Sequence, residues 1–154
     1  MERISRYLSY KEGVYSNTAV RKGLQNIPDE SQLESMKIVA EEIFEPLREW
    51  VGDKVKVNSF FRSPKVNSSV GGSRSSQHCK GQAIDIDDTF DNKTNAQMFK
   101  WIRENLDFDQ MIWEHGNDDN PNWIHVSYVG KVSNRNRCLR TYIKENGRTG
   151  YIVI

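Results

Sequence analysis

Residues 75–87 read SSQHCKGQAIDID, a stretch that places metal-binding side chain types around a glycine. His78 precedes Gly81, which permits a tight turn, and Asp85 follows in a segment that alternates apolar and acidic residues. In a strand, alternate side chains share a face, so the two isoleucines would point to the core and Asp85 to the opposite side. An imidazole and a carboxylate brought together in this way can be two ligands of a divalent metal ion.

A third ligand has to come from elsewhere, and the chain has only three histidines. His125 lies in NWIHVSY, where alternation places its side chain on the face opposite Ile124 and Val126. Two neighbouring strands would thus bring His78, Asp85 and His125 to one point. Two imidazoles, one carboxylate and an open fourth position are typical of a catalytic zinc site, in which zinc lowers the pKa of bound water to about 7 and polarises a carbonyl.

Spacing alone leaves three other interpretations of these residues open. A histidine near an aspartate is usually a hydrogen-bonded pair without a metal ion. The run DIDD at 85–88 also suits the start of a helix or a weak calcium loop, although it lacks the full oxygen-ligand pattern of an EF-hand.

Helices and strands must hold these residues in place. Apolar spacing predicts a helix over 32–50, with Ser31 and Glu34 as its capping box and with a kink or a restart at Pro46. It also predicts a second helix over 95–105. Residues 1–30 and 62–76 have the composition of irregular segments. Alternating patterns predict strands over 55–61, 82–87, 109–114 and 123–128, and a hairpin over 139–154 that turns at 145–147. Together they predict one α+β domain over 1–154, with a small antiparallel sheet and packed helices.

Composition excludes several classes of protein. The 154 residues are 36% hydrophobic and 28% charged, as in globular proteins, and the formal net charge is +1. The stretch after Val129 is basic, but such charges are usually a solvated face, so we predict no nucleic-acid partner. No apolar run has the length of a signal peptide or the about 20 residues of a membrane helix. We expect a protein made in the cytoplasm, without a membrane span.

Several motifs resemble those of a known family. SSQHCKGQAIDID looks like the SxHxxGxAxD signature of the zinc D-alanyl-D-alanine carboxypeptidases and their phage endolysin relatives. FFRSPKVNSSVGGSRSSQH resembles the stretch that leads into the family's first ligand, and WIHVSY resembles the segment with the last one. NTAVRKGLQNIP and EPLREW are similar to parts of small phage-encoded members. The resemblance implies the compact α+β fold that these enzymes share with hedgehog signalling domains.

The resemblance also implies roles for individual residues. The three zinc ligands are matched by His78, Asp85 and His125. Arg62 matches the arginine that binds and polarises the substrate, a task that suits a planar and permanently charged group. An ordinary salt bridge is the alternative for Arg62. Ser76 and Gln77, beside the first ligand, are expected to contact substrate or to orient the loop.

The general base is where the sequence departs from the family pattern. Many members carry an acid three positions before the last histidine, where this chain has Asn122, whose amide cannot accept a proton from water. Glu114, at the end of the predicted strand DQMIWE, is the predicted base and would pass the proton to the leaving amine. Asp118 and Asp119 are the next candidates. His115 would either assist catalysis or shape the following turn.

The implied activity is zinc-dependent hydrolysis of bacterial peptidoglycan stem peptides, either between the terminal D-alanines or between L-alanine and D-glutamate. We expect a monomeric lysis enzyme of a phage or prophage that acts at the cell wall after release. Three alternatives stay open. These are a zinc-containing wall-binding module that has lost catalysis, a virion structural module, and a nucleic-acid binder that uses the basic C-terminal region.

Overall fold

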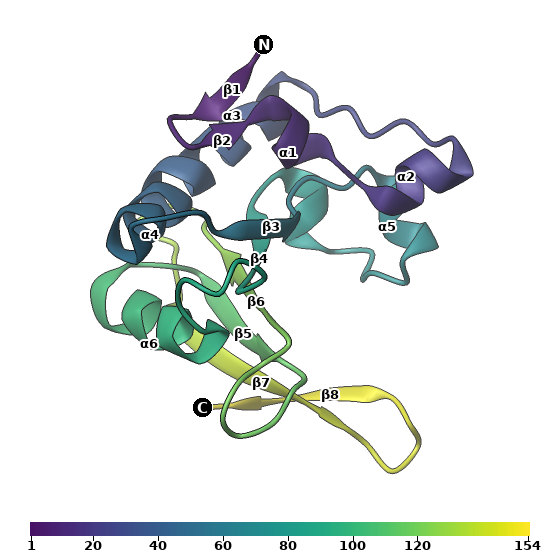
Figure 1. The fold of residues 1–154 in the computed structure, drawn as a ribbon. Coiled ribbons are helices and arrows are strands. Elements are labelled where there is room, and N and C mark those ends of the chain that lie inside the picture. The colour runs from purple at the N-terminus through teal and green to yellow at the C-terminus, as the bar shows by residue number, and fades with distance from the viewer.

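The computed structural model describes residues 1–154 and has the α+β architecture that the sequence predicts (Figure 1). Its centre is a six-stranded sheet with the strand order β3-β4-β6-β5-β7-β8. The strands are β3 (Lys56–Ser59), β4 (Ala83–Asp87), β5 (Gln110–Glu114), β6 (Trp123–Ser127), β7 (Arg137–Ile143) and β8 (Thr149–Val153). The β7–β8 hairpin extends away from the N-terminal half of the chain (Figure 1).

One strand pair is parallel, so this sheet is mixed, whereas the sequence patterns predict an antiparallel one. β6 pairs antiparallel with both β4 and β5, and therefore ends beside the start of β5. The chain then crosses to the other side of β5 and begins β7 at Arg137, opposite Gln110. For this reason β7 runs in the direction of β5. The connection spans 128–136, and no periodic pattern in it indicates the crossing.

The helix predicted over 32–50 is present as a helical segment with a local change of pitch. It comprises α3 (Glu30–Val39), the π-helical turn η1 (Ala40–Phe44) and α4 (Glu45–Val51). Asp29 and Gln32 form its capping box, two residues before the predicted pair. Pro46 lies in the first turn of α4, directly after the π-helical turn, where the ladder of helical hydrogen bonds is already altered. The second predicted helix is α6 (Asn95–Asn105).

Segments predicted to be irregular contain short elements. Within 1–30 lie β1 (Arg3–Ser5), β2 (Leu8–Ser9), α1 (Tyr10–Val14) and α2 (Asn17–Lys22), and within 62–76 lies α5 (Pro64–Ser69). These elements are too short to show a period in the sequence, and serine side chains cap the three helices among them. Ile4 and Leu8 are buried in the main core, which ties the N-terminal segment to the rest of the chain.

The main core lies between the helices and one face of the sheet. The isoleucines of β4 are buried there, together with Ile124 and Val126 of β6. Because alternate residues of a strand face opposite sides, Asp85 and His125 project from the other face. Because the helices cover the apolar face of the sheet, the opposite face can carry polar side chains. No helix has both the length and the apolar character needed to span a bilayer.

The turn between His78 and β4 requires glycine at position 81. Gly81 has a φ of +70°, and a Cβ atom there would lie 2.4 Å from the backbone oxygen of Gln32. We expect Gly81→Ala to lower the free energy of unfolding by about 1–3 kcal/mol, because the left-handed backbone and the clash both cost energy. Gly147→Ala is the matched control, since Gly147 has a φ of +80° with open space around it. Equal losses of stability in the two variants on chemical denaturation would contradict this prediction.

Candidate metal centre

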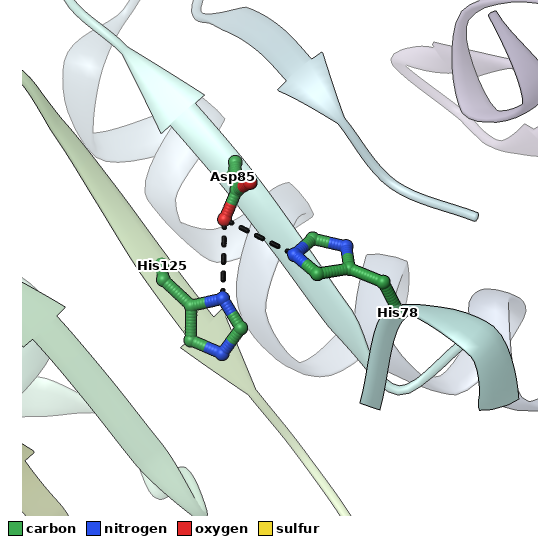
Figure 2. Close-up of side chains that lie close together, drawn as sticks. All are labelled: His78, Asp85 and His125. Carbon is green, nitrogen blue, oxygen red and sulfur yellow. Dashed lines mark hydrogen bonds and ion pairs between the residues drawn. The ribbon is translucent and has the colours of Figure 1, made fainter. Parts of the chain in front are cut away.

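Two strands and a short helix bring the three predicted ligands together. Oδ1 of Asp85 lies 3.3 Å from Nε2 of His78 and 3.1 Å from Nδ1 of His125 (Figure 2). Asp85 and His125 are paired residues of β4 and β6, and His78 belongs to the 3₁₀ helix η2 (Gln77–Lys80). Their ligand atoms all lie within 4.8 Å of one another. One metal ion could contact all three groups at this spacing.

A hydrogen bond determines how the ring of His78 meets Asp85. Nδ1 of His78 lies 2.7 Å from the backbone oxygen of Phe60, and because a carbonyl oxygen only accepts, Nδ1 carries the proton. In the neutral ring, Nε2 then presents a lone pair to Oδ1 of Asp85 at 3.3 Å. Two acceptors that face each other need a cation or a proton between them. Two imidazole nitrogens, a carboxylate oxygen and a carbonyl that orients one ring therefore fit a zinc ion.

The charge of Asp85 also suits a cation. Its side chain is largely buried, and burial by itself would raise the pKa of the carboxyl group. The imidazoles of His78 and His125 outweigh burial and hold the pKa of Asp85 below its ordinary range. The group is therefore an ionised carboxylate at neutral pH, which is the form that binds metal ions.

The acidic residues after this ligand have a structural role. Asp88 accepts hydrogen bonds from the backbone N–H of Asn95 and from the side chain of Asn120. Asp87 accepts one from the side-chain amide of Asn95. These carboxylates anchor the start of α6 and the loop before β6. The arrangement matches the helix-start interpretation of the DIDD run.

A cleft of about 780 Å³ opens beside the candidate metal centre. Its floor is the face of the sheet that carries His125, together with the alternate residues of β5. Arg62 lines this cleft next to η2, where its Nε is buried without a hydrogen-bond partner and its Nη2 is 3.5 Å from Oγ of Ser76. None of the ion pairs in the chain involves Arg62, so the salt-bridge alternative does not describe it. Its guanidinium is available to a ligand.

Among the three candidate bases, Glu114 is the one that lines the cleft. It makes no ion pair, and burial raises its pKa to about 7, with the charge of His125 opposing this effect and that of Asp85 adding to it. A carboxyl group with a pKa near neutrality can both accept and release a proton. Asp118, with a 91% exposed side chain, is paired with Arg140, and Asp119 lies in the same exposed turn outside the cleft.

The sequence also indicated a role in the site for three further residues, His115, Ser76 and Gln77. His115 lies outside the cleft and has a left-handed backbone, with a φ of +54°, so it shapes the turn after β5. Ser76 lines the cleft and caps η2 by accepting a hydrogen bond from the backbone N–H of His78. Gln77 also lines the cleft, and its side-chain amide donates a hydrogen bond to Asp109. Ser76 and Gln77 therefore both orient the turn that carries His78.

Asp109 has a role that no sequence motif indicates. Its side chain is only 4% exposed and accepts the hydrogen bond from Gln77 and two from the guanidinium of Arg135, at 2.9 and 2.8 Å. The hydrogen bonds from Arg135 in particular hold the pKa of Asp109 below its ordinary range. Asp109 thus joins the turn that carries His78 to the connection between β6 and β7. An aspartate just before an apolar strand is the only local sign of this role.

We expect Asp109→Ala to lower the free energy of unfolding by about 1–3 kcal/mol at neutral pH, because the amide of Gln77 loses its partner. The folded-state pKa of Asp109 lies below its unfolded value of about 3.9. The stabilisation that Asp109 provides is therefore fully present above about pH 3.9, and it is lost as the pH falls through the folded-state pKa of this group. Urea denaturation should show a smaller difference between wild type and variant at about pH 3 than at about pH 7. A difference that does not shrink in acid would contradict this account.

The family of the chain comes from comparison with known proteins. A family model described as Peptidase M15 matches residues 6–127, which include the three candidate ligands, Arg62 and Glu114. Among curated proteins, no significant match to the chain was found. The family match extends from β2 to β6, covers well over half of the chain and ends before β7. The chain therefore belongs to the Peptidase M15 family, a family of metal-dependent peptidases.

Proposed function

We propose that this protein is a zinc-dependent peptidase that hydrolyses peptide bonds in the stem peptides of bacterial peptidoglycan. Membership of the Peptidase M15 family supports the reaction class. The observation that carries the proposal is the convergence of His78, Asp85 and His125 beside a cleft that also holds a glutamate and an arginine without ion-pair partners. When bound there, zinc would lower the pKa of a coordinated water and polarise the scissile carbonyl.

Glu114 and Arg62 supply the rest of the chemistry. Ionised Glu114 accepts a proton from the water that attacks the carbonyl carbon, and delivers this proton to the nitrogen of the leaving amine. Arg62 donates hydrogen bonds to the substrate oxygen on which negative charge develops. Its guanidinium stays charged at any pH of interest and has a buried Nε without a partner, so it is ready to bind an oxygen ligand.

The main alternative is a zinc-containing wall-binding or virion structural module without activity. The amide of Asn122, in place of an acid, leaves this alternative open. The position of Glu114 favours the enzyme, because its carboxyl group lines the same cleft as the candidate ligands and its pKa responds to the charges of Asp85 and His125. A binding module would not need a proton acceptor at this place.

Mass spectrometry of peptidoglycan fragments tests the proposal. Purified wall material incubated with the zinc-loaded protein should release new fragments, and a chelator should stop their release. Free D-alanine would identify a carboxypeptidase, and a new amino-terminal D-glutamyl group would identify an endopeptidase. Metal-free protein with full activity, or zinc-loaded protein that leaves the wall material intact, would refute the proposed function.

Acid should inactivate the peptidase through Glu114. A base works only when ionised, so kcat/KM should rise with pH across the ionisation of this group, whose pKa burial raises to about 7. A bound dication favours the carboxylate and shifts that rise to lower pH. In metal-free protein, carbon-13 NMR should show one glutamate that titrates near pH 7 and is missing from Glu114→Gln. If every glutamate titrated near its usual pKa of about 4.3, this prediction would be wrong.

We also propose that the protein is a monomeric lysis enzyme of a phage or prophage, made in the cytoplasm and acting on the cell wall after release. The similarity of NTAVRKGLQNIP and EPLREW to small phage-encoded members supports this role. Expression in a bacterium together with a separate pore-forming protein should cause lysis, and expression of the peptidase alone should not. Analytical ultracentrifugation should show a single species with the mass of one chain.

A further inference from the structure

The C-terminal hairpin forms one wall of the cleft, although it lies beyond the residues that match the family. β7 and β8 stand at the edge of the sheet farthest from β3 (Figure 1). Ile112 of β5 pairs with His125 of β6 on one side and with Leu139 of β7 on the other. Because paired and alternate residues share a face, Leu139 and Arg137 project to the same side of the sheet as His125. Both line the cleft, as does Tyr151 of β8.

The cleft contains more positive than negative side chains. It is lined by Arg62, Lys80, Arg135 and Arg137, and by the acidic residues Asp85 and Glu114. The charge of Arg135 is balanced by its hydrogen bonds to buried Asp109. Arg62 and Arg137 make no ion pair. Two arginines without an ion pair thus line the cleft, one next to η2 and the other on the C-terminal hairpin, together with Lys80, which makes no ion pair either.

We propose that Arg137 binds a carboxylate group of the peptide substrate and thereby selects acidic peptides on the hairpin side of the cleft; this inference rests on the proposed function. The planar fork of a guanidinium matches both oxygens of a carboxylate. Tyr151, which is 54% exposed, supplies apolar surface for the peptide chain in the same wall. Arg62, beside η2, stays available to the oxygen of the scissile carbonyl, so the two arginines have separate tasks.

Two carboxylates of a stem peptide have the required chemistry. One belongs to the C-terminal D-alanine and the other is the free α-carboxylate of γ-linked D-glutamate. Four synthetic pentapeptides separate them, namely L-Ala-γ-D-Glu-L-Lys-D-Ala-D-Ala with each of these two carboxylates either free or amidated. With zinc-loaded wild type, amidation of the carboxylate that Arg137 binds should lower kcat/KM about 10–100-fold, the range typical of hydrogen bonds to charged groups.

On the peptide with the free carboxylate, the kcat/KM of Arg137→Gln should be lower than that of wild type by the same factor. The variant should cleave the free-carboxylate peptide and the amidated peptide equally well. Arg148→Gln is the matched control, because Arg148 carries the same charge in the turn of the same hairpin and lies outside the cleft. Its kcat/KM values should equal those of wild type. Melting temperatures equal to that of wild type would show that both variants are folded.

Isothermal titration calorimetry gives a readout that does not depend on turnover. Zinc-loaded Glu114→Gln protein, with and without Arg137→Gln, should bind the same peptides, and only the protein with Arg137 should prefer the free carboxylate. If wild type cleaves no peptide, the proposed function fails, while the titration still reports on Arg137. Retained preference for the free carboxylate in Arg137→Gln, or an equal loss of affinity in Arg148→Gln, would overturn the inference.

Discussion

Replacement of His125 by alanine is expected to abolish metal binding and peptidase activity together. His125 supplies one of three ligand atoms that lie within 4.8 Å of one another. Residues that only orient a metal ligand are worth about 10–100-fold in affinity, so the loss of a ligand itself should cost more than about 100-fold. Asp85 would also lose one of the two imidazoles that keep its pKa low, and would become a weaker partner for a cation.

His115→Ala is the matched control for this experiment, because it removes the same side chain just outside the cleft. Zinc content after dialysis, and the rise in melting temperature on addition of zinc, measure binding independently of activity. Wild type and His115→Ala should both retain zinc and show the rise, and His125→Ala should show neither. A His125→Ala protein that keeps one zinc ion per chain would exclude the proposed ligand set.

Glu114→Gln is expected to keep the metal and to lose most of its turnover. The amide has nearly the shape of the carboxyl group but cannot accept a proton, so only the proton transfer is removed. General acid–base catalysis contributes about 100- to 10,000-fold, and kcat should fall by a factor in this range. Zinc content should stay at the wild-type value, since Glu114 is not among the three groups whose ligand atoms converge.

Asp118→Asn is the control for the choice of base. Asp118 lies close to Glu114 in sequence, but its side chain is 91% exposed and paired with Arg140. We expect its kcat to match wild type, because an exposed ion pair outside the cleft takes no part in the reaction. A large loss in Asp118→Asn together with normal turnover in Glu114→Gln would move the base to the exposed turn.

The faces of the strands could be predicted from the sequence. Alternation along a strand is a property of its own backbone, so Asp85 is expected opposite the isoleucines of β4, and His125 opposite Ile124 and Val126. Burial of the apolar residues then determines which face meets the helices. The convergence of the two strand ligands needed two further conditions, namely that β4 and β6 are neighbours and that their register places Asp85 opposite His125.

The sequence placed Glu114 before Asp118 as the candidate base because Glu114 ends the predicted strand, but local patterns could not show which of the two lines a cleft. Glu114 ends β5 on the floor of the cleft, whereas Asp118 follows in the turn beyond it. Burial raises the pKa of Glu114. Tyr151 of β8, which is distant in the chain, lies close to it, since burial and in addition the charge of Glu114 raise the pKa of Tyr151.

The basic C-terminal stretch shows most clearly where sequence reasoning ends. By composition, Arg135, Arg137 and Arg140 are equivalent basic residues. In the structure, Arg135 is paired with Asp109, Arg137 lines the cleft, and Arg140 is paired with Asp118 on the opposite face of β7. These differences follow from the crossing of the chain from one side of β5 to the other, which makes β5 and β7 parallel neighbours. Alternation tells which side chains share a face of one strand. Which strands lie side by side depends on hydrogen bonds and packing between residues far apart in the chain, and no local pattern records them.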